Sequence, residues 1–171
     1  EAISAAAIAK IQEFDVRGLA NTVWAFAKLC VQDDPLMPSI SSAALATISL
    51  FNSQDMANTA WAFATLLCPD GPLLTAISAA SRTKQGSWLR GASPQDLSNT
   101  AWAFAALSFA SMPLLTSISA AAIPKLSEFG AQELANTAWA LAKLILADPP
   151  LLDALSAAAL RTSTEEFALQ G

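Results

Sequence analysis

The sequence has no histidine, only two cysteines and only six glycines among its 171 residues. Without histidine, the chain lacks the side chain most often used for acid–base catalysis and metal binding near neutral pH. Cys30 and Cys68 have neither CxxC spacing nor histidine partners, as a zinc site requires. No glycine-rich phosphate-binding loop is present. We therefore expect no enzymatic activity, no cofactor and no bound metal, and we expect the two cysteines to be small buried residues in a reducing compartment.

Basic residues are also few, because nine Lys and Arg stand against 14 Asp and Glu, for a net charge of −5. Such a chain has no strong general attraction to nucleic acid. Charge is missing altogether from Leu97 to Pro124, a stretch long enough to cross a bilayer. Pro113 and many serines and threonines interrupt that stretch, so we expect no membrane span. The chain begins within a helix and ends where another helix starts, which predicts that the native ends lie beyond it.

What the sequence has in abundance is internal repetition. The segment LANTVWAFAKL at Leu19 recurs as MANTAWAFATL at Met56, LSNTAWAFAAL at Leu97 and LANTAWALAKL at Leu134. The asparagines of these segments are separated by 37, 41 and 37 residues, and a Pro-Leu-Leu or Pro-Leu-Met motif recurs with the same spacing. Each repeat therefore holds two elements, one around each motif.

Both elements have helical signals. Leu, Thr, Phe and Leu around each repeated Asn fall on one face at about 100° per residue. The residue six positions before each Asn is a favoured N-cap in every copy: Asp15, Asn52, Ser93 and Gly130. The second helix opens with a proline, such as Pro35 or Pro150, in its first turn. Pro124 falls late in its helix, so we expect it to kink or shorten that helix.

The sequence thus predicts an all-α fold, a right-handed α-solenoid of two-helix repeats of about 37 residues. The expected boundaries are a partial repeat at 1–14 and full repeats at 15–51, 52–92, 93–129 and 130–167, with 168–171 starting a further repeat. The second repeat carries a four-residue insertion.

Stacking such repeats would align side chains of the first helices into ladders. The Asn shares a stripe with the residue four positions before it and the residue seven positions after it, while the Trp three positions after it borders the stripe. These candidate ligand-facing residues are Arg17, Asn21, Lys28, Gln54, Asn58, Thr65, Gln95, Asn99, Gln132, Asn136 and Lys143, and the bordering residues are Trp24, Trp61, Trp102 and Trp139. Amides and aromatic rings in a row suit an extended polymer, either single-stranded RNA or a peptide.

Packing explains part of the same pattern. Tryptophans at helical spacing often pack between repeats, and a recurring Asn can bond a neighbouring backbone and make the stack rigid. The residues four before and seven after the Asn differ between copies and are mostly polar, and packing does not require them. We therefore expect any binding specificity to lie there.

The junction at 82–92 (RTKQGSWLRGA) breaks the regular spacing and holds Arg82, Lys84, Trp88 and Arg90. Sixteen residues separate Pro72 from Trp88, the same distance that separates the corresponding prolines from Phe51 and Phe129. We expect Trp88 to replace a core phenylalanine while Leu89 to Ala92 bulge out as a loop. A basic loop that contacts an acidic partner is the alternative.

The segments LANTAWALAKL, PLLTSISAAAI and SPQDLSNTAWAFA resemble the octotricopeptide and heptatricopeptide repeats of organellar RNA-processing and translation factors, often joined to a RAP domain, in the alanine-rich form abundant in dinoflagellates. The resemblance covers essentially the whole chain. It implies a solenoid that binds single-stranded RNA in a chloroplast or mitochondrion. A Pro-Pro-Pro-Glu-Trp tract and a RAP domain are both missing from this sequence.

Two functions of different classes remain open at this point. One is an organellar RNA-binding factor, which the resemblance implies. The other is a protein-binding scaffold or peripheral subunit of a large organellar complex, such as a ribosome or a photosynthetic or respiratory assembly, which the acidic charge favours.

Overall fold

The computed structural model describes residues 2–82, 88–145 and 148–169, with side chains as far as residue 161. Throughout these ranges the ordered elements are α-helices and short 3-10 turns, and no strand occurs among them. The predicted all-α fold is therefore confirmed. The expected start of a further repeat at 168–171 falls at the end of the last helix and on residues 170–171, which lie outside the described residues.

The repeated Asn-Thr-Xaa-Trp segment forms one helix in each copy, and we call these four the inner helices. They are α2 (Val16–Lys28), α4 (Ser53–Thr65), α6 (Pro94–Ala106) and α8 (Ala131–Lys143). Each begins after its predicted N-cap. Asn52 with Asp55, and Ser93 with Asp96, form reciprocal capping boxes that satisfy backbone N–H groups at the helix start.

The second element of each repeat forms an outer helix. The outer helices are α1 (Ala2–Ala9), α3 (Leu36–Thr47), α5 (Gly71–Ala80), α7 (Met112–Ala122) and α9 (Pro149–Leu169). Pro72 and Pro113 lie in first turns, where a missing N–H costs nothing. The expectation for Pro124 is confirmed, because α7 ends at Ala122 and the chain continues as the 3-10 turn η4 (Ile123–Glu128).

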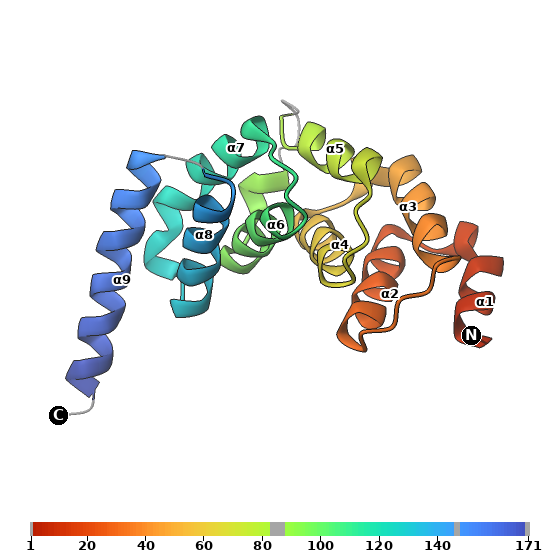
Figure 1. Ribbon diagram of the computed structural model, residues 1–171, viewed down its shortest axis with the longest axis horizontal. Helices are drawn as coiled ribbons and strands as arrows, with labels where there is room; N and C mark the ends of the chain where they lie inside the picture. The colour runs from red at the N-terminus through yellow and green to blue at the C-terminus, as the bar shows by residue number, and fades with distance from the viewer. Residues whose placement is uncertain (1, 83–87, 146–147, 170–171) are drawn as a thin grey trace.

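The two kinds of helix lie in two layers (Figure 1). Neighbouring inner helices pack side by side along the whole series, α2 against α4, α4 against α6 and α6 against α8. In Figure 1 the helices follow an arc, with α3, α5 and α7 along its outer edge and the inner helices beneath them. The N-terminus and the C-terminus lie at opposite ends of the arc.

Small residues allow the inner helices to approach closely. On α4, Ala57, Ala60 and Ala64 are at most 1% exposed. Larger apolar side chains, including Leu73, Ile77 and Phe104, are at most 2% exposed in the continuous core cluster. Because close-packed interiors tolerate little change in volume, this alternation of small and large residues fixes how neighbouring repeats sit together.

Hydrogen bonds also link successive repeats. The hydroxyls of Ser78 and Ser111 lie 2.6 Å apart, and the Lys125 ammonium donates to the Ala92 carbonyl at 2.6 Å. At the first junction the Ser4 hydroxyl donates to Asp33, which lowers the pKa of that carboxyl group. Each bond joins one repeat to the next, so the stack does not rely on apolar contact alone.

Every inner helix ends in the same strained turn. The residue after the C-cap has a positive φ of 52° to 54° although none is glycine: Cys30, Leu67, Ser108 and Ile145. In the first copy the Cys30 N–H donates to Ala27 and the Val31 N–H donates to Phe26, which is the Schellman pattern. This turn redirects the chain from the inner to the outer layer.

The outer helices lead into the inner helices through 3-10 turns with a shared register. The turns are η1 (Ile11–Glu13), η2 (Ile48–Leu50), η3 (Trp88–Gly91) and η4. The N–H of the next residue donates back to the turn in each copy: Phe14 to Ile11, Phe51 to Ile48, Ala92 to Leu89 and Phe129 to Leu126. Ala92 therefore has the same backbone position in its turn that a phenylalanine has in each of the other three turns.

This register corrects one expectation at the irregular junction. Trp88 is buried, as expected, at 7% exposure. Leu89 and Ala92 do not bulge out, because both are buried at 2% and 0% exposure and η3 keeps the register of the other turns. The prediction failed because it aligned Trp88 with the phenylalanines and so placed the extra residues after it, whereas the shared register places them before it.

Candidate functional site

One stripe of each inner helix faces solvent. In α4 and α6, which have an inner helix on both sides, nearly every residue is buried except at four recurring positions. These are the Asn, the residue four before it, the Trp three after it and the residue seven after it. The open stripe, as we call it, comprises Arg17, Asn21, Trp24 and Lys28 on α2, Gln54, Asn58, Trp61 and Thr65 on α4, Gln95, Asn99, Trp102 and Ala106 on α6, and Gln132, Asn136, Trp139 and Lys143 on α8.

The asparagines of the open stripe keep their amides available. Asn21 is exposed and Asn58, Asn99 and Asn136 are half-buried, and none of the four side chains forms a hydrogen bond with another described residue. The expectation that these amides bond a neighbouring backbone is therefore wrong for this part of the chain. Three of the four threonines next to them donate to a carbonyl of their own helix, as when the Thr100 hydroxyl donates to the Asp96 carbonyl at 2.7 Å. The buried hydroxyl of the fourth, Thr59, has no hydrogen-bond partner among the described residues.

The tryptophans form a row of partly open rings. Trp24 and Trp139 are 41% and 44% exposed, and Trp61 and Trp102 are half-buried. Trp102 and Trp139 face each other with ring centroids 6.3 Å apart and planes tilted by 31°. Two of the four rings therefore contact each other, while every ring of the row keeps part of its surface accessible to solvent.

Lys28 lies between the first two rings of the row. Its Nζ is 5.9 Å from the Trp24 ring centroid and 6.0 Å from the Trp61 ring centroid, which is cation–π range. Helical periodicity places Lys28 on the stripe but does not predict this contact, because the contact joins neighbouring repeats and depends on how they are rotated against each other.

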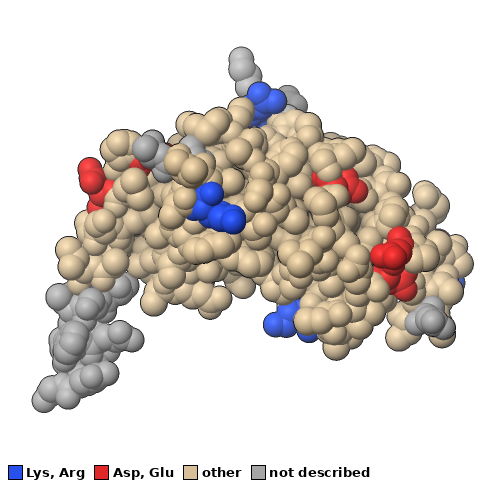
Figure 2. Space-filling model, viewed as in Figure 1, with Lys and Arg blue, Asp and Glu red and all other residues tan. Residues whose placement is uncertain are grey.

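The charge of the open stripe is opposite to that of the whole chain. Arg17, Lys28 and Lys143 give it three positive charges, and none of its positions is Asp or Glu. The chain as a whole has a net charge of −5. In Figure 2, Lys and Arg do not gather into a patch on the face shown, and most of that face is uncharged. Any attraction for an anion is therefore local and moderate.

The candidate basic loop does not come together as one surface. Arg82 and Arg90 are exposed, whereas Trp88 is in the core and its buried indole N–H has no hydrogen-bond partner among the described residues. Lys84 lies outside the described residues. Trp88 thus belongs to the packing between repeats and is not displayed beside the arginines.

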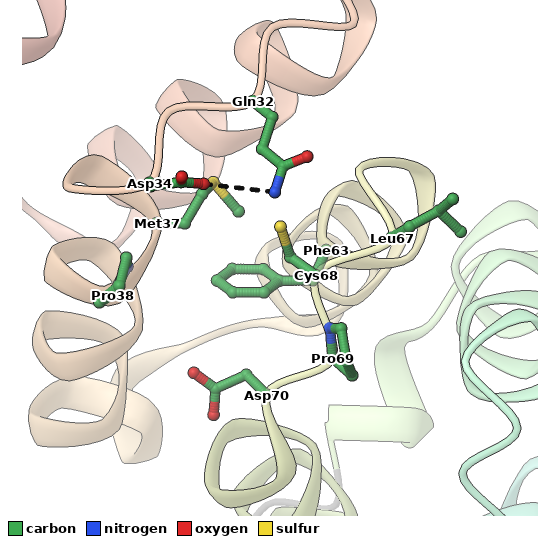
Figure 3. A pocket seen from close by; sticks show the side chains of 9 residues that line it. All are labelled: Gln32, Asp34, Met37, Pro38, Phe63, Leu67, Cys68, Pro69 and Asp70. Atoms are coloured by element: carbon green, nitrogen blue, oxygen red, sulfur yellow. Dashed lines mark hydrogen bonds between the residues drawn. The ribbon is translucent and has the colours of Figure 1, made fainter.

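A separate pocket of about 310 Å³ lies where α3 meets the connection from α4 to α5. Figure 3 shows Gln32 bonded to Asp34, at 3.4 Å, with the Phe63 ring and the Cys68 thiol also lining the pocket. Asp70 lines it too, but its carboxylate caps α5 by accepting from the Leu73 N–H at 2.9 Å. The polar groups of this pocket therefore already have structural partners.

Comparison with protein-family models gives a match over residues 1–149 to the RNA-editing substrate-binding complex 6 protein. The chain belongs to this family. The matched range contains all four inner helices, and so the whole open stripe. Comparison with curated proteins gives no match.

For this family member, neither cysteine fits the expectation of a small buried residue. Cys30 is exposed in the strained turn after α2, and Cys68 is half-buried beside the pocket. Burial, together with the charge of Asp34, raises the pKa of the Cys68 thiol. The thiolate is disfavoured there, so Cys68 is a poor nucleophile and ligand.

Among the described residues of the family member, no three His, Cys, Asp or Glu side chains gather where a metal could bind. Within the same ranges, no helix has the length and apolar character needed to cross a bilayer.

Proposed function

We propose that this chain is a non-catalytic RNA-binding segment of a right-handed α-solenoid, built from two-helix repeats of the octotricopeptide or heptatricopeptide kind. It acts in RNA processing or translation within a chloroplast or mitochondrion. The open stripe binds the RNA single strand, with the three basic residues on phosphates, the asparagine amides on base edges and the tryptophan rings on base faces.

One observation carries the proposal. The open stripe concentrates basic charge, amides without hydrogen-bond partners in the described part of the chain, and partly exposed aromatic rings in an otherwise acidic protein. Bases stack on aromatic side chains regardless of sequence, and single strands offer their edges to amides. The name of the family, which refers to binding an RNA-editing substrate, supports RNA as the ligand.

Affinity for a twelve-nucleotide single-stranded RNA, measured by fluorescence anisotropy at increasing KCl concentrations, tests the proposal. Three phosphate contacts predict that log affinity falls with log salt with a slope of about −2. Replacing Arg17, Lys28 and Lys143 together with Gln should abolish most of that slope. Replacing Arg82 and Arg90 with Gln should leave it unchanged. Absence of binding at physiological ionic strength, or a slope insensitive to the triple replacement, would contradict an RNA-binding stripe.

The net charge of −5 favours a second function, in which the chain is a scaffold or peripheral subunit of a large organellar complex and the open stripe binds a protein. Amides in a row can bond a peptide backbone as well as bases. Hydrogen exchange distinguishes the two functions in the assembled complex. Protection of the inner helices that persists after ribonuclease treatment supports the scaffold, and protection that disappears supports RNA.

A further inference from the structure

The four inner helices differ most at one position of the open stripe. The residue four after each tryptophan is Lys28, Thr65, Ala106 or Lys143. At the first junction the Lys28 ammonium is nearly equidistant from the Trp24 and Trp61 rings. At the third junction the corresponding residue is Ala106, and the Trp102 and Trp139 rings contact each other directly.

These two junctions differ in the reach of the side chain, since Lys28 extends over both rings and Ala106 cannot. A methyl group such as that of Ala106 leaves the space between successive rings free, so the rings close on each other to gain aromatic contact. A lysine holds an ammonium over both ring faces, and the rings are then bridged by a charge. The position therefore controls the space between two tryptophans without altering the packed side of the helix.

Resting on the RNA-binding function proposed above, we infer that this position gates nucleobase stacking, and that the Trp24–Lys28–Trp61 slot admits a base whereas the Trp102–Trp139 pair is closed. An incoming base takes the place of the ammonium between the rings, where it stacks on both. The flexible lysine arm swings to the neighbouring phosphate and keeps an electrostatic partner. Asn21 and Asn58 lie one helical turn before the two tryptophans, in position to bond the base edge.

The test compares two probes on the full 171-residue chain: twelve-nucleotide oligouridine and an abasic ribose–phosphate oligomer of the same length. The ratio of the two affinities isolates the contribution of the bases from that of the phosphates. Lys28→Ala, which should let Trp24 and Trp61 close, is expected to lower this ratio on the order of tenfold, the value of one stacked base. Base-dependent quenching of tryptophan fluorescence should fall with it.

Lys143→Ala is the matched control. Lys143 occupies the same position on α8, but within the described residues its ammonium does not bridge two tryptophan rings. It should weaken both probes alike and leave the ratio unchanged. Ala106→Lys, checked for folding by circular dichroism, should raise the ratio by opening the closed pair. Equal ratios for wild type, Lys28→Ala and Lys143→Ala would overturn the gate while leaving RNA binding intact. If wild type binds neither probe, the proposed function itself fails.

Discussion

Two sides of the same helix differ sharply in α6. Phe104 is completely buried, whereas Trp102, only two residues earlier, is half-buried on the open stripe. Two residues correspond to about 200° around a helix, so the two rings point in nearly opposite directions. On the packed side Leu or Met, Thr and Phe recur, with Leu141 in place of Phe in the fourth copy. On the open side Asn and Trp recur, whereas the position four after the Trp changes from Lys to Thr to Ala. One segment thus encodes a nearly constant scaffold and a surface that varies beside its constant Asn and Trp.

Truncating each aromatic ring in turn should separate the two sides most clearly. Phe104→Ala removes a fully buried ring and should destabilise the protein by about 3 to 5 kcal/mol. Trp102→Ala removes the contact with Trp139 and the buried part of the ring, so it should cost about 2 kcal/mol. Urea unfolding followed by circular dichroism measures both. Equal losses would show that the assignment of sides is wrong.

Much of the scaffold could be predicted because its signals are local. The N-caps Asp15, Asn52 and Ser93 and the break at Pro124 are set by residues within one or two turns. The residues of the open stripe could also be predicted to share one side of each inner helix, because helical periodicity alone places them there.

Features that depend on neighbouring repeats could not be predicted. Lys28 contacts the ring of the next repeat, and Ala92 takes the place of a phenylalanine because the chain recovers its register before Trp88. The non-glycine residues with positive φ were also missed, because leucine or isoleucine gives no local sign of a left-handed turn.

Two exposed leucines at the ends of the inner helices differ in backbone conformation. Leu67 is 75% exposed with φ of 52°, while the next residue, Cys68, turns back to line the pocket beside Phe63. Leu67→Gly relieves the left-handed strain and should stabilise the protein by about 0.5 to 1 kcal/mol.

Leu29 is the control, because it is 74% exposed but has an ordinary φ of −88°. Leu29→Gly should therefore destabilise by about 0.5 to 1 kcal/mol. Thermal unfolding of both variants measures this difference, and shifts in the same direction would argue against strain at Leu67.

The smallest effect is expected on the open stripe itself. Lys143 is exposed in the last turn of α8, where its charge interacts weakly with the helix dipole. Lys143→Ala should change the unfolding free energy by less than about 0.5 kcal/mol. A loss comparable to that of Phe104→Ala in the same urea titration would mean that this stripe is part of the scaffold.

Photocrosslinking tests the central claim, that the open stripe is the RNA-binding surface, most directly. A single-stranded RNA containing 4-thiouridine would be crosslinked to the chain, and the modified residues mapped by mass spectrometry. Crosslinks are expected on the stripe of α2 and α4, above all at Trp24 and Trp61. Crosslinks confined to the outer helices α3, α5 and α7, or to the arginines flanking the irregular junction, would contradict the account.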